Sequence, residues 1–286
     1  MVLYDIDAAK TEAEVLDLAH GTQFTGTSRV SGGGDIACVA GASVVVITAG
    51  AKQKPGQTRL ELAGTNVSIL ETLMPQLLAH APDAIYILVS NPVDVLTVAA
   101  AQISGLPDGH LFGSGCVLDS ARLRWLIAER SGVSQQSVHA MMLGEHGDTE
   151  FPLWSQAKIG TVPLREWRDD GGSRLFSGDV RATIHDEVVH SAYKIIAGKG
   201  ATNYAIGLSG ARIVEAVLRD EKAVLPVSTV LHGYRGIDGV ALSVPAIVGA
   251  RGIERVLDTP MDEQETRWLD RSASTLHASL TSLGLE

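Results

Sequence analysis

Short apolar runs alternate with stretches of helical periodicity through the first 115 residues, and this alternation constrains the fold more than any other feature of the sequence. It is the pattern of βαβ units, in which helices connect and cover the strands of a parallel sheet. We therefore predict an α/β fold with a doubly wound parallel sheet. The predicted strands are residues 2–6, 44–49, 85–90 and 110–113, the predicted helices include residues 8–18 and 60–80, and residues 32–34 are interpreted as a glycine turn.

Beyond Gly115 the strict alternation fades, and helices and strands follow one another less regularly. The predicted helices of this half are residues 119–131, 181–198, 203–219 and 263–283, with strands and turns at residues 223–249. We therefore place a domain boundary near residue 115. The first domain covers residues 1–115, and a second, α+β domain covers residues 116–286.

Composition and charge exclude several classes of protein. Hydrophobic residues make up 45% of the chain and charged residues 20%, which is the balance of a globular protein with a buried core. The chain has 23 Lys and Arg against 33 Asp and Glu, a net charge of −10, so nucleic acid and anionic membranes are not expected partners. An acidic start and the lack of a long apolar run indicate a cytoplasmic protein. Cys38 and Cys116 lack the spacing of a disulfide framework or metal cluster, so no metal is predicted.

Polar residues follow the predicted strands at the edge of the sheet where α/β proteins bind ligands. They are Asp5, residues 48–50 and residues 90–92. An acid at the end of the second strand of a dinucleotide-binding unit accepts both ribose hydroxyls and repels a 2′-phosphate, so Asp5 favours NAD over NADP. The alternative is that Asp5 caps the next helix.

A histidine between glycines is the strongest candidate for proton transfer, because His146 lies in the string Gly-Glu-His-Gly-Asp at residues 144–148. Asp119 and Arg122 are three residues apart on a predicted helix, so both reach a common point. An acid there orients His146, and a guanidinium holds a carboxylate. The alternatives are a structural histidine and a surface ion pair, which contributes little.

Six motifs in order carry a family resemblance: LYDID, ITAGAKQKPGQTRLEL, SNPVDVLT, GSGCVLDSARLR, GEHGDTEFPLWS and KGATNYAIGLS. Together they resemble the bacterial L-lactate dehydrogenases of the lactate/malate dehydrogenase superfamily, over essentially the whole chain. The resemblance implies a Rossmann-type NAD-binding domain followed by an α+β catalytic domain. It also implies a homotetramer that interconverts pyruvate and L-lactate with NAD.

The resemblance assigns a role to each candidate. His146 gives its proton to the pyruvate oxygen, and Asp119 orients the imidazole ring and stabilises its charge. Arg122 holds the substrate carboxylate through two hydrogen bonds. Arg59 closes over the site on the loop of residues 50–59 and polarises the carbonyl, and Asn91 hydrogen-bonds the reacting oxygen or its histidine partner.

Substrate choice, by the same resemblance, depends on Gln53 and Thr202. In the malate dehydrogenases an arginine replaces Gln53, because oxaloacetate carries a second carboxylate that needs a counter-charge. The neutral side chains here favour pyruvate over oxaloacetate. A malate or other 2-hydroxyacid dehydrogenase is the less favoured alternative.

The resemblance also implies cofactor and effector contacts. Arg124 and His139 match positions at which allosteric members bind fructose 1,6-bisphosphate between subunits, which makes this sugar bisphosphate a possible effector. A helix-surface arginine and a core histidine are the alternative. The implied NAD contacts are Asp5, Lys10, Gly50, Ala51, Val89, Asn91 and Ser114.

The glycine fingerprint GxGxxG is absent from its expected place ahead of Asp5. We expect a strand, glycine turn and helix of about 30 residues to precede Met1, with the missing strand lying centrally between residues 2–6 and 44–49. Without it, the cofactor half loses backbone amides for the pyrophosphate and buried strand contacts. A non-catalytic or inactive truncated paralogue is therefore an alternative, which calorimetry of NAD binding distinguishes.

Overall fold

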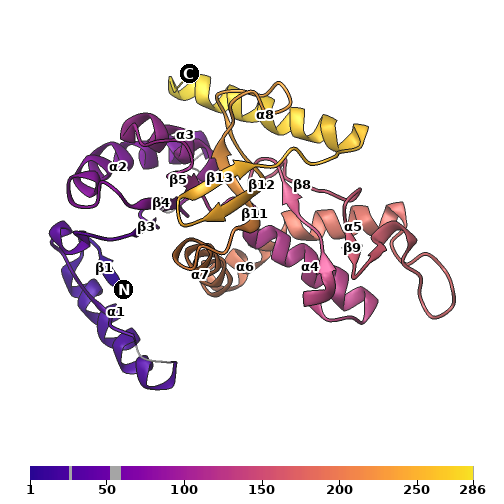
Figure 1. The fold of residues 1–286 in the computed structure, drawn as a ribbon, viewed down its shortest axis with the longest axis horizontal. Coiled ribbons are helices and arrows are strands. Elements are labelled where there is room, and N and C mark those ends of the chain that lie inside the picture. Colours follow the sequence, from indigo (N-terminus) through magenta and orange to yellow (C-terminus); the bar gives the residue numbers. More distant parts are fainter. Residues whose placement is uncertain (26–27, 52–58, 286) are drawn as a thin grey trace.

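A six-stranded mixed sheet forms the centre of the computed structural model, which describes residues 1–25, 28–51 and 59–285 (Figure 1). The strand order is β13-β12-β11-β5-β4-β3. The parallel strands are β3 (Val44–Ile47), β4 (Ile85–Leu88) and β5 (Leu111–Gly113). The antiparallel strands β11 (Ala223–Val230), β12 (Ala241–Gly249) and β13 (Gly252–Val256) continue the same sheet. The predicted α/β class is confirmed.

Strand β4 is buried on both faces, as its unbroken apolar run requires. Tyr86 and Leu88 pack among side chains of α2 (Arg59–His80) and α3 (Val93–Ser104). Ile85 and Ile87 point to the opposite face and pack against α7 (Tyr204–Leu218). Figure 1 shows α2 and α3 on one side of the sheet and α7 on the other, the layering of a doubly wound fold.

The N-terminal segment forms its own small sheet. β1 (Val2–Tyr4) pairs in parallel with β2 (Ser31–Gly33), and α1 (Ala8–Gly21) and the short helix η1 (Thr22–Phe24) lie between them in sequence. β1 and β3 therefore belong to different sheets, which is where the sequence predicts a missing strand. This segment lies at the edge of the molecule in Figure 1.

The glycine turn predicted at residues 32–34 is wrong, because Gly32 and Gly33 lie in strand β2. A β-carbon on Gly32 would lie 2.2 Å from the carbonyl oxygen of Leu3. Only glycine allows β1 and β2 to approach this closely. The chain turns afterwards, through η2 (Ile36–Val39), where Asp35 accepts a hydrogen bond from the amide of Ala37.

The second half of the chain carries helices around two small antiparallel sheets, whose orders are β10-β9-β6 and β7-β8. The predicted boundary at residue 115 stays a prediction, since β11 pairs with β5 across it. The strands are β6 (Val138–His139), β7 (Met142–Leu143), β8 (Phe151–Pro152), β9 (Lys158–Ile159) and β10 (Val162–Pro163). The helices are α4 (Val117–Ser131), η3 (Gln135–Ser137), η4 (Leu164–Glu166), α5 (Gly178–Val189), α6 (Ser191–Lys199) and α8 (Glu263–Leu283). In the described part of the chain, no helix is both long and apolar enough to cross a membrane.

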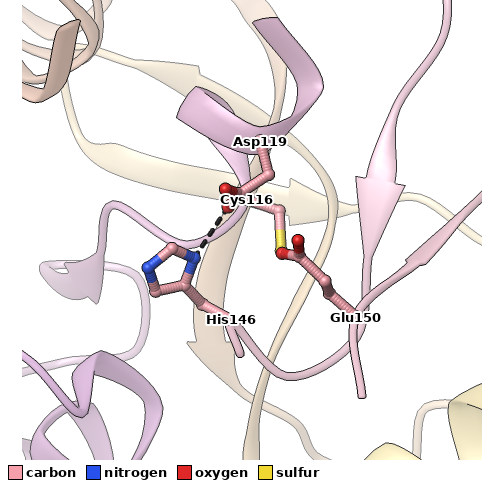
Figure 2. Close-up of side chains that lie close together, drawn as sticks. All are labelled: Cys116, Asp119, His146 and Glu150. Carbon is pink, nitrogen blue, oxygen red and sulfur yellow. Dashed lines mark hydrogen bonds and ion pairs between the residues drawn. The ribbon is translucent and has the colours of Figure 1, made fainter. Parts of the chain in front are cut away.

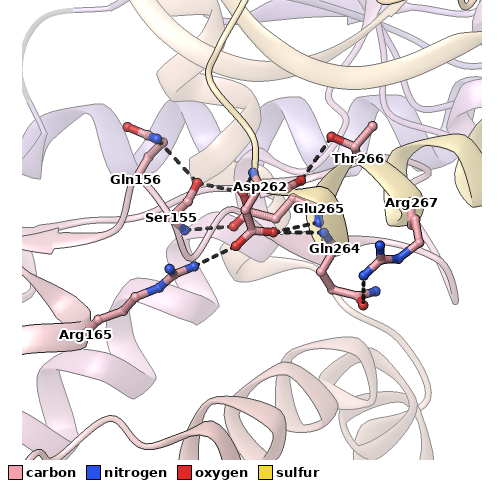
Figure 3. Close-up of polar contacts among 8 residues, drawn as sticks. All are labelled: Ser155, Gln156, Arg165, Asp262, Gln264, Glu265, Thr266 and Arg267. Carbon is pink, nitrogen blue, oxygen red and sulfur yellow. Dashed lines mark hydrogen bonds and ion pairs between the residues drawn. The ribbon is translucent and has the colours of Figure 1, made fainter.

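The predicted C-terminal helix is confirmed as α8, and a buried acid fixes its start (Figure 3). Asp262 and Glu265 form a capping box, in which the Glu265 carboxylate accepts the amide of Asp262 at 2.9 Å. Glu265 is only 1% exposed and also accepts the amide and hydroxyl of Ser155, at 2.8 and 2.6 Å. Arg165 pairs with Asp262 at 2.7 Å. One carboxylate thus joins α8 to the segment that follows β8.

Replacing Glu265 by alanine is expected to destabilise the fold by about 2–4 kcal/mol, because it leaves the amides of Ser155 and Asp262 without acceptors. Urea unfolding followed by circular dichroism measures the change. The matched control is Glu263→Ala in the same helical turn, whose side chain is 96% exposed and lies 3.7 Å from Arg267. This control substitution should lower the free energy of unfolding by less than about 0.5 kcal/mol. Equal losses in the two variants would contradict the assignment.

Candidate active site

The carboxyl ends of three adjacent parallel strands bring most of the predicted cofactor contacts to one edge of the sheet. Gly50 and Ala51 follow β3, Val89 and Asn91 follow β4, and Ser114 follows β5. The strand ends are joined directly, since the amide of Val89 donates to the carbonyl of Ile47 at 2.9 Å and that of Ser114 to Leu88 at 2.7 Å. The sequence therefore predicted this grouping correctly, and the role of these residues in binding NAD stays a prediction.

Asn66 holds two of these strand ends together and was missed by sequence reasoning. It is buried in α2 at 2% exposure, its Oδ1 accepts the amide of Ala51 at 2.7 Å, and its Nδ2 donates to the carbonyl of Asn91 at 2.7 Å. Asn66 lies four residues from Leu62 and Leu70, so it interrupts an apolar helix face. A buried polar residue in that position needs partners, and this was the available signal.

Asp5 ends β1 with its carboxylate partly exposed, and it does not cap the next helix. Asp7 is the N-cap of α1, where its side chain accepts the amide of Lys10. Asp5 instead accepts the amide of Asp7 at 3.1 Å and the ammonium of Lys10 at 3.3 Å. The amide of Asp7 and the charge of Lys10 lower the pKa of Asp5. The capping alternative is therefore wrong, and Asp5 is an ionised acceptor beside Lys10.

His146, Asp119 and Arg122 meet at one point, as the sequence predicts. The Asp119 carboxylate is 1% exposed and lies in the first turn of α4. Its Oδ2 lies 2.7 Å from Nδ1 of His146, and its Oδ1 accepts Nη1 of Arg122 at 2.6 Å. Figure 2 shows the imidazole ring turned toward this carboxylate. The alternative of a surface ion pair is therefore wrong, and the role of His146 in proton transfer stays a prediction.

The protonation states of His146 and Asp119 follow from their contacts with each other and with Arg122. Burial disfavours a charge on His146, but the ion pair and hydrogen bond with Asp119 outweigh it and raise the pKa of His146 to about 9. Burial also disfavours the charge on Asp119, yet His146 and Arg122 hold its pKa below the usual range. At neutral pH the imidazole is therefore protonated through Nδ1 and Nε2, and the ring is oriented by Asp119.

A second buried acid, Asp94, fixes the backbone of the histidine loop and was also missed by sequence reasoning. Its Oδ2 accepts the amide of His146 at 2.7 Å, and its Oδ1 accepts the hydroxyl of Ser228 on β11 at 2.5 Å. Burial raises the pKa of Asp94 to about 6, against the hydrogen bond from Ser228. Asp94 thus joins α3, the loop of residues 144–148 and the central sheet. The motif SNPVDVLT contained it, but spacing alone gave it no partner.

Cys116 and Glu150 lie beside the pair of His146 and Asp119 (Figure 2). One donor atom from each of Cys116, Asp119, His146 and Glu150 lies within 4.8 Å of the others, and the thiol donates to Glu150 Oε2 at 3.6 Å. These are donor types that metal ions accept, but both oxygens of Asp119 are already engaged by His146 and Arg122. We therefore interpret the cluster as a hydrogen-bonded network of titratable side chains. The predicted lack of a metal stays a prediction.

The remaining predicted residues are placed less directly. Gln53 lies outside the described residues, and Arg59 begins α2 with its side chain outside them. Thr202 lies half-buried in the connection between α6 and α7. The Nε of Arg124 donates to the carbonyl of Ala140 at 2.8 Å, and His139 is the exposed residue just before it on β6. Arg124 and His139 therefore lie close together, and their effector role stays a prediction.

Comparison with known families matches both halves of the chain. Residues 1–113 match the NAD binding domain of lactate/malate dehydrogenase, and residues 116–284 match the alpha/beta C-terminal domain of the same enzymes. A curated L-lactate dehydrogenase of Bifidobacterium animalis subsp. lactis is 48% identical over 284 residues, which cover 99% of this chain and 89% of the relative. An L-lactate dehydrogenase of Synechococcus is 45% identical and covered to 90%.

Solved structures agree with these sequence comparisons. The minor L-lactate dehydrogenase of Enterococcus mundtii superimposes with a TM-score of 0.93 at 40% identity, covering 100% of this chain and 90% of that one. A lactate dehydrogenase from a deep-sea metagenome library of the Medee basin also gives 0.93, at 36% identity, with 99% and 90% covered. With both domains matched and the histidine, aspartate and arginine in contact, the chain belongs to the lactate/malate dehydrogenase family.

Proposed function

We propose that this protein is an L-lactate dehydrogenase that interconverts pyruvate and L-lactate with NAD. The observation that carries the proposal is the contact of buried Asp119 with both His146 and Arg122. A proton donor and an anion-binding guanidinium beside one another are what the reduction of a 2-keto acid needs. Relatives named L-lactate dehydrogenase at 40–48% identity over nearly the whole chain support the same substrate.

His146 is the proton donor in the direction of pyruvate reduction. Its Nδ1 is held by Asp119, so Nε2 is the nitrogen left to face the substrate oxygen. Because Asp119 raises the pKa of His146 to about 9, the ring carries its proton at neutral pH and gives it up as negative charge develops on that oxygen. In lactate oxidation the neutral ring takes the proton back.

Arg122 binds the substrate carboxylate. Its Nη1 is bonded to Asp119, so the other guanidinium nitrogens remain for a second anion. With His146 protonated, this group holds two cations against one carboxylate, which favours an anionic keto acid. By the family resemblance, Arg59 has the role of a third cation at the carbonyl, and Asn91 has that of a hydrogen-bond donor to the reacting oxygen or a partner of the histidine.

The donor set at the strand ends fits NAD, whose reduced form would supply the hydride to pyruvate and whose oxidised form would accept it from lactate. The ionised Asp5 suits the ribose hydroxyls of the adenosine half, with Lys10 beside it. A β-carbon on Gly50 would lie 3.3 Å from Asn66 and from Ser90, so glycine lets the backbone pass closely there, beside the proposed pyrophosphate position. The neighbouring Ala51 amide is held in place by Asn66. Val89, Asn91 and Ser114 form the nicotinamide side.

The alternatives have less support. A non-catalytic paralogue has no reason to retain a protonated histidine held between two buried acids, as His146 is between Asp119 and Asp94. A malate dehydrogenase requires a second cation where this chain has Gln53. A homotetramer in the cytoplasm, as the family resemblance implies, completes the proposal.

Replacing Asp119 by asparagine should remove the charge that keeps His146 protonated. We expect the pKa of His146 to fall by more than about one pH unit and pyruvate reduction at pH 7 to fall about a hundredfold or more. The alkaline limb of the pH profile measures the first effect, and turnover with NADH measures the second. The control is Asp270→Asn, an exposed acid on α8 that should change neither.

The same substitution predicts a change in stability with pH. The pKa of His146 is raised from 6.5 to about 9, so the pair stabilises the fold fully below pH 6.5 and this contribution is lost as pH rises through 9. Urea unfolding between pH 6 and 10 should therefore show a smaller decline in the asparagine variant. An identical decline would contradict the assigned ion pair.

Gln53→Arg should change substrate choice. A guanidinium at this position supplies the counter-charge for the second carboxylate of oxaloacetate, so we expect the ratio of kcat/KM for oxaloacetate over pyruvate to rise at least about tenfold. Lys54→Arg, which adds no charge in the same loop, is the matched control. An unchanged ratio in Gln53→Arg would refute the proposed role.

Fructose 1,6-bisphosphate is proposed as an activator that binds Arg124 and His139 from paired subunits. The nearness of Arg124 to the carbonyl of Ala140, the neighbour of His139, supports a joint site. Adding the effector should lower the KM for pyruvate, and His139→Ala should abolish that response while leaving the basal rate unchanged. His20→Ala in the last turn of α1 is the control. A KM that ignores the effector in the unmodified protein would reject the site.

A further inference from the structure

Glu150 is a buried carboxyl group beside the catalytic pair that the mechanism above does not use. It is 3% exposed and directly precedes β8. Its backbone is fixed on both sides, because its amide donates to the carbonyl of Gly147 at 3.3 Å and its carbonyl accepts Nε2 of His185 at 2.8 Å. Figure 2 shows its side chain turned toward Cys116 and Asp119 rather than outward.

The carboxyl groups of Glu150 and Asp119 are close enough that ionisation of one disfavours ionisation of the other. Donor oxygens of both residues lie within 4.8 Å of one another, in a place from which water is largely excluded. Two like charges at this distance and depth are costly, so one of the two groups holds a proton. The pair titrates together, with one proton shared between two sites.

The neighbouring cations decide which acid keeps the proton. Asp119 is bonded to His146 at 2.7 Å and to Arg122 at 2.6 Å, so its ionised form is strongly stabilised. In the described part of the chain, no lysine or arginine lies within ion-pair distance of Glu150, and the Cys116 thiol donates to its Oε2 at 3.6 Å. The proton therefore belongs on Glu150.

The groups that face this acid come from every element packed against it. Those on α4 and its N-cap are Cys116, Asp119 and Arg122, those of the histidine loop are Glu145 and His146, and α3 and α5 contribute Asp94 and His185. Of these, Arg122 and His146 carry positive charge, and both are already paired with Asp119.

The titration behaviour agrees with this placement. Burial, the Asp119 charge and a hydrogen bond with Asp119 raise the pKa of Glu150 well above its usual range. The same hydrogen bond is one cause that lowers the pKa of Asp119. Burial, with the negative charge of Asp119 adding to it, raises the pKa of the Cys116 thiol well above its usual range, so the thiol stays neutral. At neutral pH the cluster then consists of one carboxylate, one carboxylic acid and one thiol.

We propose that Glu150 is a neutral carboxylic acid that donates a hydrogen bond to the Asp119 carboxylate and acts as a positioning residue for the His146–Asp119 pair. The bond adds to those that Asp119 accepts from His146 and Arg122, and it lowers the basicity of Asp119 toward the imidazole. Neutrality of Glu150 also keeps two cations against one anion where the keto acid binds, whereas an ionised Glu150 would cancel that excess. The inference deepens the proposed function and rests on it only for the catalytic consequence.

Protonation of Glu150 is tested without turnover. Infrared spectra of protein labelled with ¹³C in its glutamates, recorded at pH 8, should contain the C=O stretching band of a carboxylic acid, and Glu150→Gln should remove that band. Asp94 is not labelled, and exposed glutamates are ionised at this pH. Absence of the band in the unmodified protein overturns the proposal, even if every variant fails to fold.

The influence on His146 is tested by its NMR titration and by the alkaline limb of the pH profile. Glutamine is neutral and retains a donor, so Glu150→Gln should leave the His146 titration within about 0.3 pH units. Glu150→Ala removes the donor, so Asp119 becomes more basic and the His146 titration should move upward. The surface variant Glu187→Gln should have no effect, because Glu187 pairs with Arg130 on α4.

The opposite result is equally clear. If Glu150 were ionised, both substitutions would remove a negative charge near His146 and move its titration downward, by about one pH unit or more. A downward movement in Glu150→Gln therefore overturns the proposal. Infrared and NMR signals need no substrate. If the unmodified chain had no lactate dehydrogenase activity, the proposed function would be wrong, but these two tests of Glu150 would be unaffected.

Discussion

Asp119 carries a full negative charge at 1% exposure, and the arrangement of the site depends on how that charge is compensated. An unpaired carboxylate at this depth would take up a proton, and His146 would then lose the partner that orients it. His146 and Arg122 compensate the charge from two oxygens. The same contacts fix the ring and the guanidinium, so one buried ion supplies charge balance, orientation and anion binding together.

Polar contacts that join separate elements hold the backbone around the site. Asp94 ties the amide of His146 to α3 and, through Ser228, to the central sheet. Asn66 ties the loop after β3 to the loop after β4. These residues contact no reacting atom in the proposed mechanism, yet they set the distances between those that do. Buried polar groups with complete partners are rigid, which suits a site that must hold its geometry.

Much of the fold was predictable because burial imposes periodicity on the sequence. The unbroken apolar run of β4 and the apolar stripe of α8 follow from two-sided and one-sided burial. The sequence predicted a turn at Gly32, where the structure has a strand, because a turn and a close approach of two strands both favour glycine. Asp119, His146 and Arg122 were found through spacing and motif, whereas Asp94, Asn66 and Glu150 were not. Their partners come from distant segments, and no local pattern encodes such contacts.

The division of the sheet gives Asp5 a different mechanical setting from the other predicted cofactor contacts. Gly50, Asn91 and Ser114 follow strands that are hydrogen-bonded in one sheet, so the ladder fixes the spacing of the strand ends from which they extend. Asp5 ends β1, whose sheet contacts the rest through η2, where Ile36 and Val39 pack on the core of β3, β4 and α2. Side-chain packing yields more readily than a hydrogen-bonded ladder. The adenosine end of the proposed cofactor site is therefore the part whose geometry depends on apolar contacts rather than on strand pairing.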